Sequence, residues 1–253
     1  MQFTTYLSLL AAVGGVPNGP WAVVTGASSG IGREMALEAA ARGYSVVVSA
    51  RRLDALEELA AEIQQTYSVS ALAVAADLSS KDGAMELHRT TTSVHHLKSE
   101  TELVIANAGY AMTGNMVDTS LEQIERMAGV NMLSVAVLCR LYGADLRGIR
   151  RGALLLTSSL TALAPLPGAA MYAASRSFVY NLASSLATEL APENVLVRCV
   201  LPGSTDTGFA ATSGIETSLA FNGPGFRMLR VITTAQQVAV AALGAQPASV
   251  HTP

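Results

Sequence analysis

Thr25-Gly26-Ala27-Ser28-Ser29-Gly30-Ile31-Gly32 is the stretch that decides the fold of this chain of 253 residues. The apolar run Trp21–Thr25 leads into it and predicts a buried strand. After it, Arg33–Arg42 has the apolar spacing of a helix, and Gly43 provides a natural end for that helix. The domain therefore opens with a glycine-rich turn between a strand and a helix.

The three glycines of this turn have separate physical uses. Gly26 permits a sharp bend, Gly30 lets the backbone approach a phosphate group, and Gly32 allows the helix to pack close to the sheet. The helix N-terminus then presents free N–H groups and the positive end of its dipole to phosphates. An ordinary glycine-rich turn is the alternative, but the strand–turn–helix context favours a dinucleotide site.

Short apolar runs alternate with longer helical patterns along the rest of the chain. Continuous apolar strands separated by helices indicate parallel pairing with both sheet faces covered. We therefore expect an α/β fold, a single Rossmann-type doubly wound parallel sheet with helices on both faces. The expected further strands are Ser45–Ala50, Ala71–Ala75, Leu103–Ala106, Ala153–Thr157 and Val195–Leu201, and the expected helices are Leu53–Tyr67, Leu121–Leu146, Tyr172–Leu190 and Ala239–Leu243.

Residues 1–20 are expected to form an apolar extension before a single domain over residues 21–253. Met1–Val13 is shorter than the roughly 20 apolar residues that span a bilayer, and it lacks the basic start of a secretory signal. It is either a membrane-facing, anchoring or targeting segment within residues 1–16 or a packed extension. Localisation therefore stays open between the cytoplasm and an organellar lumen or matrix. Ser249–His251 is expected to be the start of a last strand at an abrupt chain end.

The composition is that of a compact globular protein, with half of the residues apolar, 14% charged and a net charge of −3. No basic surface is expected, so nucleic acid is not an expected partner. Cys139 and Cys199 lie in apolar runs and are expected to be buried thiols, which favours a reducing compartment. His95 and His96 are expected at the surface, and no metal site is expected.

The chain resembles the short-chain dehydrogenase/reductase family over roughly Trp21–Thr207. Beyond the glycine loop, the resemblance rests on motifs that occur in the family's order and at its spacing. They are Asp77 with Leu78 after the third strand, Asn107-Ala108-Gly109 after the fourth, Asn131 in a long helix, Ser159 and Tyr172 thirteen residues apart, and Pro202-Gly203 with Thr207. The resemblance implies a nicotinamide cofactor held by Gly26, Ser28, Ser29, Gly30, Ile31, Gly32, Asp77, Leu78, Asn107, Ala108, Gly109, Pro202, Gly203 and Thr207.

The resemblance also implies catalytic roles for Asn131, Ser159 and Tyr172. Hydride transfer to a carbonyl carbon builds negative charge on the oxygen, so a phenol must deliver a proton and a hydroxyl must stabilise that charge. Tyr172 would be the acid/base, and Ser159 would hold the carbonyl. Free tyrosine has a pKa of about 10, so a nearby positive charge is needed to make its ionised form accessible near neutral pH.

Arg176 stands where the family has a lysine, four residues after the tyrosine. Arginine keeps the positive charge, but it is bulkier and does not release a proton, because its pKa lies above about 12. One interpretation is conservative drift, since the chain has 14 arginines and only two lysines, Lys81 and Lys98. The other is a catalytically impaired subunit with a structural or regulatory role in a larger complex, either at a membrane or away from one.

Arginines at the end of the second strand indicate which nicotinamide cofactor is preferred. An acidic residue there would bind the ribose 2′-hydroxyl and repel a 2′-phosphate, but this chain has Ala50 followed by Arg51 and Arg52. Arg33 follows the glycine loop. Guanidinium groups match phosphate oxygens, so NADP(H) is predicted, unless these arginines only solvate the start of a helix.

The expected substrate side is apolar. Leu160, Leu163, Leu166 and Met171 would form one wall, and a lid over about residues 208–230 would form the other. These walls favour a lipophilic ketone, aldehyde or acyl substrate for a carbonyl reductase or alcohol dehydrogenase. By resemblance, homo-oligomers would pair through the long helices, where Ala183, Ser184 and Ala187 permit close approach unless that face packs on the sheet.

Overall fold

The computed structural model describes residues 19–94, 97–203, 205–206 and 233–244. Six parallel strands form one sheet in the order β3-β2-β1-β4-β5-β6. Their bounds are β1 Trp21–Thr25, β2 Ser45–Ala50, β3 Ala71–Ala75, β4 Thr101–Ala106, β5 Ala153–Thr157 and β6 Leu196–Val200. All six predicted strands are confirmed, although β4 begins two residues earlier than predicted and β6 is one residue shorter at each end.

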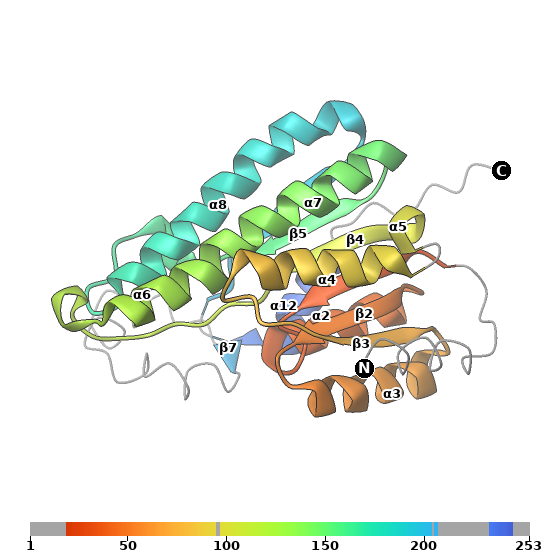
Figure 1. Ribbon diagram of the computed structural model, residues 1–253, viewed down its shortest axis with the longest axis horizontal. Helices are drawn as coiled ribbons and strands as arrows, with labels where there is room; N and C mark the ends of the chain where they lie inside the picture. Colours follow the sequence, from red (N-terminus) through yellow and green to blue (C-terminus); the bar gives the residue numbers. More distant parts are fainter. Residues whose placement is uncertain (1–18, 95–96, 204, 207–232, 245–253) are drawn as a thin grey trace.

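Helices cover both faces of this sheet, which confirms the predicted doubly wound architecture. On one face lie α2 Gly30–Ala41, α3 Leu53–Tyr67 and α12 Ala235–Gly244 (Figure 1). On the other face lie α4 Lys81–Ser93, α7 Ser134–Ile149 and α8 Ala170–Leu190 (Figure 1). A small second ladder pairs β7 Thr205–Asp206 with β8 Thr233–Thr234.

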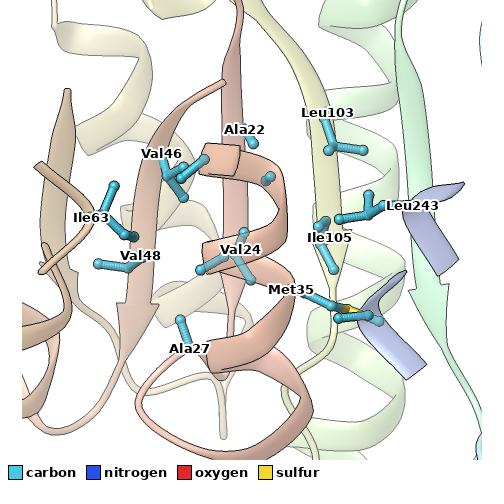
Figure 2. Packing of buried hydrophobic residues seen from close by; sticks show 14 of the residues in the cluster. Ala22, Val24, Ala27, Met35, Val46, Val48, Ile63, Leu103, Ile105 and Leu243 are labelled. Carbon is cyan, nitrogen blue, oxygen red and sulfur yellow. The ribbon is translucent and has the colours of Figure 1, made fainter. Parts of the chain in front are cut away.

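Successive strand residues bury their side chains on opposite faces of the sheet. Val24 and Val48 belong to the apolar cluster under α2, α3 and α12, whereas Val23 and Val47 belong to the cluster under α4, α7 and α8. This alternation explains why the strands are apolar along their whole length. Figure 2 shows the first cluster, in which Met35 of α2 and Leu243 of α12 meet Ala22, Val24, Val46, Val48, Leu103 and Ile105.

The strand order reverses between β1 and β4. After β1 the chain adds β2 and β3 on one side and then returns to place β4 on the other side of β1. All strands are parallel, so their carboxyl ends share one edge. The crevice outside this edge, at the point of reversal, is where open α/β sheets bind ligands.

Helix α4 was not predicted from the sequence. Gly83 and the run Thr90–Thr92 lower the helix propensity of this segment. Ser80 caps the helix by accepting a hydrogen bond from the Gly83 amide at 3.4 Å, and Ala84 and Leu87 are buried. Tertiary packing therefore overrides weak local propensity here.

The predicted long helix over Leu121–Leu146 is three elements in succession. Helix α6 covers Leu121–Ala128, a π-helical turn covers Gly129–Leu133, and α7 continues to Ile149. A capping box of Ser120 and Gln123 begins α6. The stretch Leu121–Ile149 is long and apolar enough to cross a membrane by composition, but half of its most apolar window is buried inside the fold, as in a core helix.

Helix α8 begins at Ala170, two residues before the predicted start. Ala183, expected on a face open to a second protomer, is only 2% exposed and packs in the core beneath α8. For Ala183 the interface prediction is therefore wrong, and the alternative of packing on the sheet holds. Ser184 is exposed and Ala187 is half-buried.

Candidate functional site

The glycine loop after β1 is tightly packed by its own neighbours. Gly26 has φ +69° and Gly30 has φ +59°, both in the left-handed region that favours glycine. A Cβ at Gly32 would overlap the carbonyl oxygen of Gly26 and reach 2.5 Å from Nδ2 of Asn107. The predicted turn at Gly26 and the predicted close packing at Gly32 are therefore confirmed.

Thr25 fixes this loop to the chain after β4, a role that the sequence did not reveal. Its hydroxyl donates to the Ile105 carbonyl at 3.2 Å and accepts from the amides of Asn107 and Ala108, each at 3.1 Å. The side-chain amide of Asn107 donates to the Thr25 carbonyl at 3.1 Å. Asn107 and Ala108 thus hold the glycine loop in place.

The three arginines predicted near a 2′-phosphate lie in different surroundings. Arg51 is exposed, with no hydrogen bond or ion pair to another described residue. Arg52 is also exposed and donates from Nη2 to the carbonyl and hydroxyl oxygens of Ser28, at 3.1 and 3.2 Å. Arg33 forms ion pairs with Glu62 and Glu34. Arg51 is therefore the most available of the three for an anionic ligand.

The loop after β3 is held by close backbone contacts on two sides. A Cβ at Gly83 would overlap the Asp77 carbonyl, and a Cβ at Gly129 would overlap the Ser79 carbonyl. Asp77 is exposed, and the Ser79 amide donates to it at 3.0 Å, which lowers the pKa of the Asp77 carboxyl. Leu78 is buried beneath the loop. Gly83 and Gly129 are contributors to this edge that the sequence motifs did not point to.

Helix α8 is fastened to the end of β5 by hydrogen bonds around the catalytic candidates. The Ser158 hydroxyl donates to the Arg176 carbonyl at 2.7 Å, and Nη1 of Arg176 donates to the Thr157 carbonyl at 3.0 Å. Ser159 accepts from the Thr161 amide at 3.2 Å. Tyr172 is 6% exposed in the same region. The edge therefore brings Ser159, Tyr172 and Arg176 together, and Ser158 has a structural role there.

Asn131 joins three segments from inside the π-helical turn. Fully buried, it accepts from the Tyr110 amide at 3.1 Å and donates to the Tyr110 carbonyl at 2.8 Å. Its amide nitrogen also donates to the Ser175 hydroxyl at 3.1 Å, and that hydroxyl donates to the Tyr172 carbonyl at 2.7 Å. Both N–H groups of Asn131 are thus used in positioning the backbone around Tyr172. Tyr110 and Ser175 were not predicted as members of this network.

The Arg176 guanidinium lies in the floor of this region. Arg176 is 3% exposed, its Cζ lies 5.1 Å from the centre of the Tyr172 ring, and its Nη2 lies against Gly109. A Cβ on Gly109 would overlap that nitrogen, so Gly109 makes room for the guanidinium. Nε of Arg176 is buried and has no hydrogen-bond partner among the described residues. Arg176 is thus held against the tyrosine and the chain after β4.

Apolar side chains surround Tyr172. A small buried cluster contains Ala111, Met127, Leu166, Ala169, Tyr172 and Ala173, with Met112 and Met171 packed against it. The loops after β4 and β5 meet where the Gly114 amide donates to the Gly168 carbonyl at 2.8 Å. Leu166 and Met171, both predicted for the substrate wall, thus pack around Tyr172, while Leu160 and Leu163 are exposed in the 3₁₀ turn Leu160–Leu163.

A hydrogen bond joins the loop after β6 to the loop after β5, where the Leu160 amide donates to the Pro202 carbonyl at 3.0 Å. This bond places Pro202 and the adjacent Gly203 beside the Ser159 region. Pro202 is half-buried and Gly203 is exposed. Thr207, the predicted lid over about residues 208–230, the segment 1–16, His95, His96 and Ser249–His251 lie outside the described residues.

Neither cysteine is in a disulfide, as expected. Cys139 is buried on α7, whereas Cys199 on β6 is only half-buried. Burial raises the pKa of Cys139 to about 12 and that of Cys199 to about 11. Both thiols therefore stay protonated near neutral pH, which does not suit a nucleophile.

A family model described as short chain dehydrogenase matches residues 20–217 of the chain. Probable oxidoreductase EphD of Mycobacterium tuberculosis strain H37Rv is 34% identical over 205 residues, which are 80% of this chain and 33% of that protein. The very-long-chain 3-oxoacyl-CoA reductase of Podospora anserina is 30% identical over 208 residues, which are 81% of this chain and 60% of that protein. The chain thus spans less than two thirds of the length of these relatives.

A solved structure shares the fold closely. The short-chain dehydrogenase from Sphingobium yanoikuyae in complex with NADPH superposes with a TM-score of 0.78 at 29% identity. The superposition covers 89% of this chain and 83% of that one. The predicted Rossmann-type fold is therefore matched over nearly the whole length of both chains.

Proposed function

This chain belongs to the short-chain dehydrogenase/reductase family, and we propose that it is an NADP(H)-dependent oxidoreductase acting on a lipophilic carbonyl compound or its alcohol. The observation that carries the proposal is the network of Asn131, Ser175 and Tyr172, together with the bond from Ser158 to Arg176, which positions a buried phenol beside a guanidinium. The NADPH bound by the Sphingobium relative supports the same cofactor class here.

The residues at the carboxyl edge fit a phosphorylated dinucleotide. The glycine loop presents backbone where side chains would collide, at Gly26 and Gly32. Helix α2 begins at Gly30, and its N-cap, Ser29, makes no side-chain cap hydrogen bond, so N–H groups stay open for a phosphate. Arg51, exposed at the end of β2, supplies a cation for a 2′-phosphate.

Bound NADPH would supply a hydride to the carbonyl carbon. Tyr172 would transfer its phenol proton to the carbonyl oxygen, so that a C–H and an O–H bond form and the carbonyl becomes an alcohol. The Ser159 hydroxyl would hold the same oxygen as its charge develops. The apolar residues Leu166 and Met171 around Tyr172 favour a lipophilic substrate and exclude water.

Arg176 is the feature on which the catalytically impaired alternative depends. Its guanidinium donates to the Thr157 carbonyl and lies against Gly109, and an arginine does not exchange a proton as a lysine can. The same position beside Tyr172 keeps a positive charge near the phenol, which favours activity. The remaining catalytic candidates, Asn131 and Ser159, are both present.

The test combines binding with turnover. Purified protein is titrated with NADPH and NADH by fluorescence, and NADPH consumption is followed with a panel of lipophilic ketones and aldehydes. We expect NADPH binding with turnover that falls at least about a hundredfold in Tyr172→Phe, because the general acid is removed. NADPH affinity should stay close to that of the wild type in this variant.

The outcomes separate the two functions. NADPH binding without turnover, unchanged in Arg176→Lys, would support the impaired subunit. Turnover that appears only in Arg176→Lys would identify Arg176 as the residue that abolishes activity in the wild type. Absence of binding by either cofactor would contradict the proposed function itself.

A further inference from the structure

The strand order assigns the two ends of a dinucleotide to opposite sides of β1. The phosphate side, defined as the loops after β1, β2 and β3, holds the glycine loop and Arg51. The carbonyl side, defined as the loops after β4 and β5 together with α8, holds Tyr172 and Arg176. If the adenosine phosphates occupy the phosphate side, as the proposed function requires, the nicotinamide must lie on the carbonyl side.

Arg176 places a buried positive charge on the carbonyl side. The residue is 3% exposed, and among the described residues its guanidinium donates one hydrogen bond, to a neutral acceptor, the Thr157 carbonyl. Nε is buried without a partner, and no carboxylate of the described residues pairs with the guanidinium. Burying a cation away from a counter-charge costs free energy unless a ligand compensates it.

Cζ of Arg176 lies 5.1 Å from the centre of the Tyr172 ring, so the ring makes a cation–π contact with the guanidinium but provides no carboxylate to pair with it. Arginine also keeps its proton at every ordinary pH, so the charge is permanent. A ligand whose positively charged ring lies beside the Arg176 guanidinium is repelled by it, whereas a ligand with a neutral ring is not. In a partly buried site, a charge several ångströms away changes binding by about tenfold or more.

The oxidised and reduced cofactors differ by this one charge. The nicotinamide ring is positive in NADP+ and neutral in NADPH, whereas the phosphates and the adenosine are the same in both. We propose that Arg176 makes the site bind NADPH more tightly than NADP+. This inference rests on the proposed function and adds to it a preference between the two redox forms of the cofactor.

Isothermal titration calorimetry with NADPH and with NADP+ tests the inference without any turnover. The ratio of the two dissociation constants is measured in wild type, Arg176→Met, Arg176→Lys and Tyr172→Phe. Arg140→Met, which removes an exposed arginine on α7, is the matched control. We expect wild type to favour NADPH and Arg176→Met to reduce the ratio by about tenfold, because the repelling charge is gone. Arg176→Lys, Tyr172→Phe and Arg140→Met should keep the ratio.

An unchanged ratio of the two dissociation constants in Arg176→Met would overturn the inference. Equal affinities for NADPH and NADP+ in Tyr172→Phe would overturn it as well, because they would assign the preference to the phenol. Thermal unfolding establishes whether Arg176→Met is folded. If Arg176→Met does not fold, the ratio of the two dissociation constants in wild type and in Arg176→Lys tests the inference instead. Equal affinities for NADPH and NADP+ in the wild type would also overturn the inference. Failure of the proposed function is distinct, since neither cofactor would then bind.

Discussion

The phosphate side and the carbonyl side of the sheet edge are stabilised in different ways. On the phosphate side, backbone packs directly against backbone at Gly26 and Gly32, and the charged side chain of Arg51 extends from the surface. On the carbonyl side, Asn131 and Arg176 are buried and held by hydrogen bonds from three segments. The phosphate side thus fixes its backbone and leaves the Arg51 side chain available, while the carbonyl side fixes its side chains.

This difference separates recognition from chemistry. An exposed guanidinium contributes charge, and it can be exchanged without disturbing the packing around it. A buried polar side chain contributes geometry, and its removal leaves partners unsatisfied. Substitutions on the phosphate side, apart from those in the glycine loop, should therefore change which cofactor binds. Substitutions on the carbonyl side should change stability and turnover together.

The largest effect is expected where backbone meets backbone. Gly32→Ala places a Cβ on the Gly26 carbonyl, which has no room to move because Thr25 and Asn107 hold the loop. We expect a loss of about 3 kcal/mol in the free energy of unfolding together with a loss of NADPH binding. Denaturant unfolding and fluorescence titration measure the two effects.

Gly109→Ala is the matched control on the carbonyl side. There the new Cβ meets the end of the Arg176 side chain rather than backbone, so a smaller loss of stability is expected. Equal losses of stability in Gly32→Ala and Gly109→Ala would contradict the proposed difference between the two sides.

Cofactor choice should respond next most strongly. Arg51→Asp replaces an available cation by a group that repels a 2′-phosphate and accepts from a 2′-hydroxyl. The ratio of NADPH affinity to NADH affinity should fall about a hundredfold, as expected when a charge-assisted hydrogen bond is exchanged for repulsion. Arg33→Ala is the control, because Arg33 is occupied by Glu62 and Glu34, and its effect on the ratio should be small. An unchanged ratio in Arg51→Asp would remove the basis for the NADP(H) prediction.

The network around Asn131 should show the smallest of the three effects. Asn131→Ala leaves the buried amide and carbonyl of Tyr110 without their partner, which should lower the free energy of unfolding by about 2 kcal/mol. Turnover should also fall, because Ser175 and the backbone of Tyr172 lose their support. Ser175→Ala should cost less, since it removes only one bond to Asn131. A fully stable Asn131→Ala would mean that water replaces the amide.

Much of the sheet could be predicted because its signals are local. The strand Ser45–Ala50 and the helix Leu53–Tyr67 have the predicted bounds, since continuous apolar runs and helical periodicity mark them within a few residues. Helix α4 escaped prediction because its own sequence is a weak helix former. The π-helical turn Gly129–Leu133 escaped because it interrupts neither the apolar composition nor the helical spacing around it.

Only those site residues that match a family motif could be predicted from the sequence. The structure brings Ser159, Tyr172, Arg176 and Asn131 to one edge, but the partners Thr25 and Ser175 carried no signal of their own. Thr25 bonds to residues more than 80 positions away, and Ser175 bonds to Asn131 from 44 positions away. Hydrogen bonds of this range depend on the finished fold and leave no periodic pattern in the sequence.

The bond from Thr25 to the chain after β4 also bears on the order of folding. The glycine loop is contiguous in sequence, yet its final form requires Asn107, which leaves the ribosome 82 residues after Thr25. Pairings this far apart form late, because the intervening chain must first be ordered. A nascent chain that ends before β4 would thus contain the whole glycine motif and still lack a formed phosphate loop. Cofactor binding during folding would therefore indicate that β4 has paired with β1.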